Sequence, residues 1–355
     1  MTRNSSISSS ERRAPGAPGM LLRVALMALL PIVPFVVLYV ALDPYRVLRH
    51  HDNYYTDRVS FNSNVLTLHT FEDLNPSQRY NSFIVGSSLA INLPAKEWEH
   101  HLQPDARPFH FNAGNLNLHN TRMFLEYLDR HADTISNVLI PLTPHVLRLQ
   151  YSPNNLATMI PPEIDRSGIG GLLRFHYRYF RRVTDYGFYA SYLPWILRGE
   201  TVNFPGCPVF YEEEYEWDRV LNEEYQPISD SIIAVNPAEY YFRHKVYTPA
   251  PSDSYAEAPR LIDDALEADL RAIAEICRRR GADLTVIATP TLKLETFDSE
   301  DEKRLRDIFG ESYVNLQREF RQEVADSTNW YDNTHYRPVM GKRFIDRAYE
   351  LRRKR

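Results

Sequence analysis

The segment Phe83-Ile84-Val85-Gly86-Ser87-Ser88 decides how this 355-residue chain is interpreted. Three consecutive apolar residues, two of them β-branched, are typical of a buried strand in a parallel sheet. The glycine that follows is typical of a tight turn at the end of such a strand. The stretch therefore predicts a strand over residues 79–86 and places Ser88 just beyond its carboxyl end.

Outward from this stretch, strand-like and helix-like segments alternate along the chain. Strands are expected at 79–86, 109–114, 137–142 and 282–289, and helices at 93–102, 121–131, 261–280 and 339–353. Charged helices are expected to run to about residue 324, before a short last strand that ends at Trp330-Tyr331. Such alternation predicts an α/β fold with a parallel sheet and helices on both faces. Ligands of such sheets bind beyond the carboxyl ends of the strands.

The alternation stops between about residues 145 and 258, where tyrosine, phenylalanine, tryptophan and proline are abundant. We interpret this stretch as a large aromatic-rich insertion after the third strand, lying over the same end of the sheet. Its aromatic faces could stack on sugar rings or lie at a membrane interface. The alternative is a small satellite core built by aromatic packing.

Residues 24–42 form an apolar run without a charged side chain. As a helix with a rise of 1.5 Å per residue the run would span about 28 Å, close to the hydrocarbon thickness of a bilayer. It predicts one transmembrane anchor over residues 20–42, preceded by a disordered cytoplasmic tail at 1–19 and followed by an extracytoplasmic domain at 43–355. A cleaved signal peptide and a buried soluble helix are the alternatives, but no small-residue cleavage site follows the run and it has no polar face. Positive charge is greater before the run than after it, and this modest excess favours a tail inside the cell. The arginines are Arg3, Arg12, Arg13 and Arg23 before the run, and Arg46 and Arg49 after it.

The net charge of −5 argues against a nucleic-acid-binding protein that relies on phosphate neutralisation. Only two cysteines occur, Cys207 and Cys277, and they form either a disulfide or two free thiols. No cysteine or histidine cluster has the spacing of metal ligands, so neither a metal nor a cofactor is expected. The histidines without a metal pattern are His100, His101, His110, His119 and His145.

The second segment with chemical potential is Asp332-Asn333-Thr334-His335, about twenty residues before the C-terminus. A serine hydroxyl is a poor nucleophile unless a base removes its proton, and histidine is suited to that task near neutral pH. A carboxylate orients the histidine and stabilises its charged form. We therefore assign Ser88 as nucleophile, His335 as base and Asp332 as the orienting group. In the alternative interpretation, Ser87-Ser88 caps a helix, Asp332-Asn333 forms a turn and His335 lies on the surface.

These two segments resemble the first and last blocks of the SGNH (GDSL-like) hydrolase superfamily. Gly86-Ser87-Ser88 is similar to the Gly-Asp-Ser block and residues 332–335 to the Asp-x-x-His block. The likeness covers about residues 79–144 and 259–353, and is nearest to the membrane-anchored bacterial branch that includes DltD and the alginate O-acetylation proteins. It implies a flavodoxin-like three-layer SGNH fold with a parallel sheet and one N-terminal transmembrane helix.

The resemblance also implies an oxyanion hole. Its donors would be the backbone amides of Ser88 and of Gly114 or Asn117, depending on the register of the second block. The third block, Gly-x-Asn-Asp, is missing, because Pro141-Leu142-Thr143-Pro144-His145 follows the third strand. Its asparagine donor is therefore lost or is replaced by Thr143.

We therefore expect a single-pass protein of a bacterial inner membrane, with its N-terminus in the cytoplasm and its main domain in the periplasm. It would be a serine O-acyltransferase or esterase that acts on acyl groups of the cell envelope or an exopolysaccharide through an acyl-Ser88 intermediate. An integral-membrane O-acyltransferase is a partner implied by resemblance alone. The alternative is a non-catalytic envelope protein that binds polysaccharide or a membrane partner through the aromatic insertion.

Overall fold

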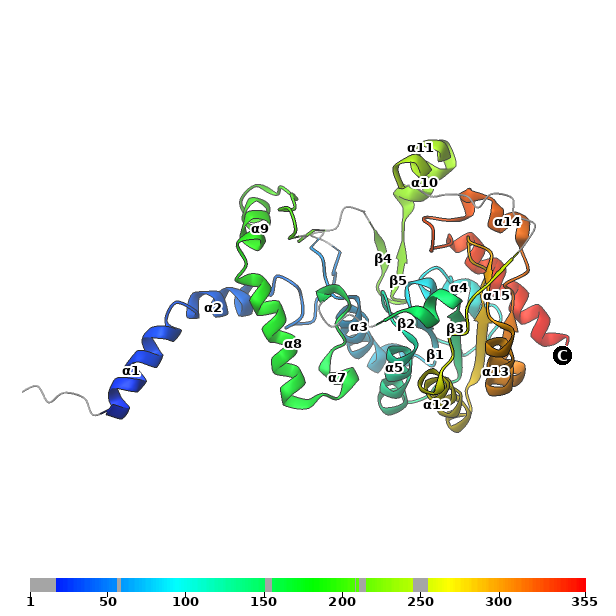
Figure 1. The fold of residues 1–355 in the computed structure, drawn as a ribbon, viewed down its shortest axis with the longest axis horizontal. Coiled ribbons are helices and arrows are strands. Elements are labelled where there is room, and N and C mark those ends of the chain that lie inside the picture. The colour runs from blue at the N-terminus through cyan, green and yellow to red at the C-terminus, as the bar shows by residue number, and fades with distance from the viewer. Residues whose placement is uncertain (1–16, 56–58, 151–154, 208, 211–214, 245–254) are drawn as a thin grey trace, which may run out of the picture.

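The computed structural model describes residues 17–55, 59–150, 155–207, 209–210, 215–244 and 255–355 (Figure 1). Its centre is a five-stranded sheet in which all neighbouring strands are parallel, in the order β2-β1-β3-β7-β9. The strands are β1 (Ser82–Gly86), β2 (Pro108–Asn112), β3 (Asn137–Leu142), β7 (Asp283–Ala288) and β9 (Tyr313–Asn315). The predicted α/β class with a parallel sheet is confirmed.

The strand order changes direction at β1. The chain passes from β1 to β2 on one side of it and then to β3 on the other, and both strands pair with β1 in parallel. Loops that leave β1 and β3 must therefore diverge, which opens a crevice beyond the carboxyl ends of these strands. The turn after Gly86 carries Ser88 into this region.

Helices cover both faces of the sheet (Figure 1). On one face, Phe71 of α3 (Ser63–Gln78) packs against Phe83 and Phe111, with ring centroids 6.0 and 5.2 Å apart, and α5 (Leu118–His131) packs beside α12 (Asp264–Arg280). On the other face, the Trp98 indole of α4 (Ala95–Glu99) donates to the Tyr349 hydroxyl of α15 (Pro338–Arg353) at 2.8 Å. Successive side chains of a strand point to opposite faces, so both faces of each strand are buried.

The shorter elements connect and extend this frame. The remaining helices of the sheet domain are α6 (Pro144–Arg148), α13 (Ser299–Phe309) and α14 (Arg321–Ala325), with two-residue strands β6 (Ala256–Glu257) and β8 (Glu295–Thr296). Single 3-10 turns lie at η1 (Ser88–Ala90), η2 (Leu156–Thr158), η3 (Gly310–Ser312) and η4 (Ser327–Asn329).

The expected last strand ending at Trp330-Tyr331 is wrong. Trp330 forms only an isolated bridge with Tyr336, and the fifth strand of the sheet is β9, inside the stretch expected to be helical. Three residues are too few to show a periodic pattern, so β9 is recognisable only from its pairing with β7. Helix α3 was also not expected, and it begins where the Asn62 side chain accepts hydrogen bonds from the amides of Asn64 and Val65.

The predicted single helix over 20–42 is divided into α1 (Ala17–Leu29) and α2 (Val33–Leu42). The break lies at residues 30–32, next to Pro31 and before Pro34, where the missing proline amides interrupt the helical hydrogen bonds. Within the described residues, no helix has the length and apolar character needed to cross a membrane. The tail at 1–16 lies outside the described residues.

The insertion has two parts. The first comprises α7 (Pro162–Asp165), α8 (Gly168–Val183) and α9 (Tyr186–Arg198), and lies beside α2 (Figure 1). The Tyr39 hydroxyl of α2 meets Nδ1 of His176 on α8 at 3.0 Å, and a second buried cluster includes Tyr45, Tyr179 and Phe188. The interpretation of these aromatics as a satellite core is confirmed.

The second part of the insertion lies above the end of β1 (Figure 1). It consists of the hairpin of β4 (Glu216–Asp218) and β5 (Glu223–Tyr225), followed by α10 (Pro227–Val235) and α11 (Pro237–His244). Cys207 of the insertion and Cys277 of α12 are both free and buried, and they belong to different clusters. The choice between a disulfide and two thiols is therefore decided in favour of thiols.

A small histidine cluster joins the loop after α2 to α3. The Tyr54 hydroxyl lies 2.7 Å from Nδ1 of His69, and the His50 ring stacks on the His69 ring with centroids 4.0 Å apart. Burial lowers the pKa of His69 to about 3, the imidazole of His50 lowers it as well, and Asp73 opposes the effect. The folded protein therefore holds His69 neutral.

This cluster predicts a loss of stability on mild acidification. Because the unfolded chain binds a proton at His69 below about pH 6.5 and the folded chain does not, the free energy of unfolding falls by up to about 1.4 kcal/mol per pH unit below that value, until the pH approaches the folded pKa. Urea midpoints of the full chain at pH 7.5 and 5.5 measure the effect, and His69→Gln should reduce the difference between them. Equal differences in wild type and variant would contradict the prediction.

Candidate active site

Ser88 follows β1 through a turn that only glycine makes easily. Gly86 has a φ of +150°, outside the region that residues with a Cβ prefer. Ser88 then begins the 3-10 turn η1, where the Ser87 side chain accepts a hydrogen bond from the Leu89 amide at 3.4 Å. The capping alternative therefore holds for Ser87, and the Ser88 hydroxyl is left for other partners.

The structure brings Ser88, His335 and Asp332 together in one hydrogen-bonded row. Nε2 of His335 lies 2.7 Å from the Ser88 Oγ, and Nδ1 of His335 lies 2.6 Å from Oδ2 of Asp332. A carboxylate can only accept, so the imidazole proton belongs on Nδ1, and Nε2 is free to accept the serine proton. These are the relative positions that a nucleophile, a base and an orienting carboxylate require.

The Asp332 carboxylate also shapes the loop that carries the base. Its Oδ1 accepts hydrogen bonds from the backbone amides of Thr334 and His335 at 2.6 and 2.8 Å, while Oδ2 is left for the imidazole. The turn at Asp332, which the alternative interpretation predicted, and the contact that orients His335 are therefore made by the same carboxylate. Burial raises the pKa of Asp332, but the hydrogen bonds and charge of His335 and the backbone amides outweigh it and hold the pKa below its ordinary value.

The reacting groups are accessible. The side chains of His335 and Asp332 are 30% and 46% exposed. They border a pocket of about 200 Å³ that also reaches the Ser88 hydroxyl. Its lining residues are Ser88, Ile91, Asn92, Tyr215, Glu224, Gln226, Tyr240, His244, Tyr331, Asp332 and His335.

The insertion is fastened to the loop that carries Asp332 and His335. The Tyr240 hydroxyl of α11 donates to the Tyr331 carbonyl at 3.1 Å, and the carboxylate of Asp230 on α10 accepts from the Tyr331 hydroxyl at 3.0 Å. Arg337 donates to the same carboxylate at 2.8 Å. The second part of the insertion therefore forms one wall of the pocket, and it is held in place by the loop that carries Asp332 and His335.

The segments that carry His335 and Ser88 are also joined below the pocket. The Tyr336 hydroxyl, fully buried, donates to the Leu89 carbonyl at 2.7 Å. Gly341 of α15 lies so close to the loop after Ser88 that a Cβ there would be 1.8 Å from the Asn92 carbonyl oxygen. The absence of a side chain at Gly341 thus allows α15 to pack against this loop.

Gly341→Ala is predicted to push the loop after Ser88 away from α15. The clash with backbone atoms should cost about 1–3 kcal/mol of stability and should also lower the reactivity of Ser88. Chemical denaturation and the rate of serine labelling measure the two effects. Gly170→Ala is the matched control, since nothing lies within 4 Å of its added methyl group, and it should leave both quantities near wild type.

The structure gives partners to groups of the three residues considered for the oxyanion hole. The Gly114 amide donates to the Ser63 hydroxyl at 3.1 Å, the Asn117 side chain caps α5 by accepting from the Asn120 amide, and the Thr143 side chain caps α6 by accepting from the Val146 amide. None of the three is among the described residues that line the Ser88 pocket. The Gly114 amide and the Thr143 hydroxyl thus have other partners, whereas a donor role of the Asn117 backbone amide stays a prediction.

Several polar residues of the pocket were not predicted from the sequence, among them Asn92 and Glu224. Asn92 follows Ser88 by four residues and is 5% exposed, and Glu224 comes from the insertion. Burial raises the pKa of Glu224, although a hydrogen bond with Tyr55 and the charge of His110 oppose the shift. The closeness of Asn92 to Ser88 was a usable signal, whereas nothing in the sequence relates Glu224 to Ser88, more than 130 residues before it, or to the loop at 332–335, more than 100 residues after it.

Three of the other histidines have structural partners. His110 is fully buried with Glu223 at 3.6 Å, His101 meets Asp346 at 2.8 Å, and His119 meets Asp269 at 3.2 Å. Among the described residues, no group of three or more histidine, cysteine or acidic side chains is arranged to hold a metal ion.

Comparison with protein-family models gives no match, and no curated protein matches this chain in sequence. The function of this protein is therefore inferred from the geometry of the Ser88 site.

Proposed function

We propose that this protein is a serine esterase or O-acyltransferase of the SGNH type. The observation that carries the proposal is the row of hydrogen bonds from Ser88 through His335 to Asp332. Two further features support the family. The strand order is that of flavodoxin-like sheets, and the nucleophile follows the first strand while Asp-x-x-His precedes the last helix.

The chemistry follows from the positions of the three side chains. His335 takes the proton of the Ser88 hydroxyl as the oxygen attacks an ester carbonyl, and Asp332 stabilises the imidazolium that forms. The tetrahedral intermediate collapses when His335 passes its proton to the leaving alcohol, which gives an acyl-Ser88 ester. An acceptor hydroxyl then enters and loses its proton to His335 as its oxygen attacks the acyl carbon. The bond between the acyl carbon and the Ser88 Oγ breaks, His335 passes the proton to this Oγ, and the acceptor keeps the acyl group; where the acceptor is water, hydrolysis results.

The developing oxyanion requires hydrogen-bond donors in the pocket. The Ser88 amide stands at the first position of η1, where no intrahelical acceptor exists for it. Asn92 supplies a side-chain amide from the same pocket. In this proposal Asn92 takes the role of the asparagine in the missing third block.

The assignment of Asn92 can be tested by substitution. Removal of one oxyanion donor costs a factor on the order of 10²–10³ in rate, so Asn92→Ala should slow the acylation of Ser88 by that amount. Stopped-flow or time-resolved labelling with an activated ester measures the rate. Gln226→Ala removes another amide from the pocket and is the control. Equal rate losses in the two variants would contradict a specific role for Asn92.

Acyl transfer is favoured over hydrolysis by the construction of the pocket. It is small, and the α10–α11 segment is tied to the catalytic loop by hydrogen bonds through Tyr240 and Asp230. In this proposal the acceptor, when bound against this wall, displaces water from around the acyl-enzyme. In this proposal the acceptor is a hydroxyl of an envelope polysaccharide, residues 20–42 anchor the protein in the inner membrane, and an integral-membrane O-acyltransferase delivers the acyl group.

The decisive test is labelling of the serine by a fluorophosphonate probe. Wild type should be labelled at Ser88, Ser88→Ala should not react, and His335→Ala should react slower by a factor on the order of 10³ or more. Ser87→Ala is the matched control, because it removes the neighbouring hydroxyl and costs only a cap, about 1 kcal/mol of stability. Labelling that persists in Ser88→Ala would show that another residue is the nucleophile.

Absence of labelling in a folded sample would instead favour a non-catalytic protein that binds polysaccharide or a membrane partner through the aromatic insertion. The packing of the insertion gives this alternative less support, since Phe175, Tyr179, Phe188 and Tyr192 are buried in the satellite core. Tyr177 and Tyr186 remain exposed for such contacts.

A further inference from the structure

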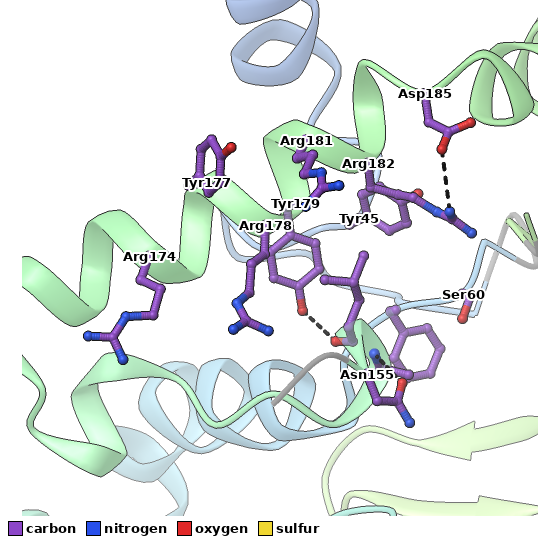
Figure 2. Close-up of a pocket in the computed structure, with 13 residues that line it drawn as sticks. Tyr45, Ser60, Asn155, Arg174, Tyr177, Arg178, Tyr179, Arg181, Arg182 and Asp185 are labelled. Carbon is purple, nitrogen blue, oxygen red and sulfur yellow. Dashed lines mark hydrogen bonds and ion pairs between the residues drawn. The ribbon is translucent and has the colours of Figure 1, made fainter. Parts of the chain in front are cut away.

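A second pocket, of about 830 Å³, lies beside α8 and shares no lining residue with the Ser88 pocket (Figure 2). Its walls come from α8, from Tyr45 in the loop after α2, from residues 60–61 and from residues 155–157. This volume is typical of sites for small organic ligands. The catalytic proposal makes no use of it.

Four arginines of α8 line this pocket: Arg174, Arg178, Arg181 and Arg182. Arg174, Arg178 and Arg182 are spaced four residues apart, so their side chains occupy one side of the helix. Figure 2 shows Arg174 and Arg178 pointing toward the segment that carries Asn155. Like charges at this spacing destabilise a helix, so the cluster needs an explanation other than helix stability.

Among the described residues that line the pocket, four arginines face a single acidic residue. This residue is Asp185, and its carboxylate lies 3.8 Å from the Arg182 guanidinium. The pocket therefore carries an excess of positive charge, arranged around a concave surface, and favours an anionic ligand.

The Tyr45 hydroxyl is an independent sign of a missing ligand. Tyr45 is 4% exposed and lines the pocket with its hydroxyl beside the Arg182 guanidinium, which can only donate, so within the described residues the hydroxyl proton has no acceptor. A buried hydroxyl proton without an acceptor is costly, which a ligand oxygen accepting from it would relieve. Asn155 adds a second neutral donor, because its Oδ1 accepts from the Ala157 amide and its Nδ2 remains to donate.

We propose that this pocket binds an organic phosphate. Guanidinium groups match phosphate oxygens in pairs, and the Tyr45 hydroxyl and the Asn155 amide add donors to the same anion. The volume exceeds that of a phosphate alone, and Phe61, Leu156 and Ala157 provide an apolar wall for the organic part of the ligand.

Two sources of such a phosphate fit the location. Helix α2, part of the segment predicted as an anchor, packs on α8 through Tyr39 and His176, so a lipid head group would approach the pocket from the membrane side. A soluble sugar phosphate would enter from the aqueous phase. The phosphate is common to both, and the experiment distinguishes them.

Calorimetric titration of the full chain in a neutral detergent tests the proposal. The probes are dihexanoyl phosphatidic acid and glucose 1-phosphate, each compared with its phosphate-free counterpart, dihexanoylglycerol or glucose. Arg174→Gln with Arg178→Gln should weaken binding of the phosphate probe by about tenfold or more, because charge-assisted hydrogen bonds are lost. The control is Arg260→Gln with Arg353→Gln, which removes the same charge from exposed positions outside the pocket and should change binding less than about twofold.

Tyr45→Phe separates ligand binding from folding. Because the hydroxyl proton has no acceptor without ligand, removal of the hydroxyl should change the melting temperature little, while phosphate binding weakens several-fold. Tighter binding of phosphatidic acid than of glucose 1-phosphate identifies a lipid source, and the reverse identifies a soluble one. The proposal is overturned if neither phosphate binds more tightly than its counterpart, or if the Arg174 and Arg178 double variant binds as wild type does. Fluorophosphonate labelling of Ser88 should be the same in the Arg174 and Arg178 double variant as in wild type. The result of the phosphate titration is therefore independent of the catalytic proposal.

Discussion

The close packing of α15 against the loop after Ser88 is the constraint on which the rest of the site depends. Gly341 lies against the Asn92 backbone, and the Tyr336 hydroxyl bonds the Leu89 carbonyl. The hydrogen bond joins residues 247 apart in sequence, and the two contacts together leave little freedom in the distance between the Ser88 turn and the His335 loop. Both contacts involve backbone atoms of the serine loop, so they position it independently of its side chains.

The insertion serves this arrangement in two separate ways. Its second part bonds to the catalytic loop and forms a wall of the Ser88 pocket, whereas its first part joins α2 in an aromatic cluster and carries the arginine pocket. The chain thus has one polar pocket at Ser88, for which we propose acyl chemistry, and one cationic pocket beside the apolar N-terminal helices. If both proposals hold, an anionic ligand is held on the side of the protein where α2 packs on α8, while the acyl group is handled at the end of the sheet (Figure 1).

Much of the frame could be predicted from local patterns, and the exceptions have physical causes. Strands β1, β3 and β7 are short apolar runs bounded by turn residues, and α12 and α15 have apolar residues at helical spacing. Strand β9 was not predicted because three residues are too few to show a periodic pattern. Trp330 suggested a strand because it is apolar and aromatic, but its burial comes from side-chain packing and its indole donates to the Val324 carbonyl.

The sequence by itself determined the class of fold, the position of Ser88 after β1 and the pairing of Asp332 with His335, because each depends on residues close together in the chain. Only the tertiary structure decided the distance between Ser88 and His335, the place of Asn92 and Glu224 in the pocket, and the use of the Gly114 amide by Ser63. Such features depend on which backbone and side-chain groups the packing of distant elements leaves unpaired. A local sequence pattern cannot predict this, because a polar group is available for chemistry only when the groups around it in space form hydrogen bonds elsewhere.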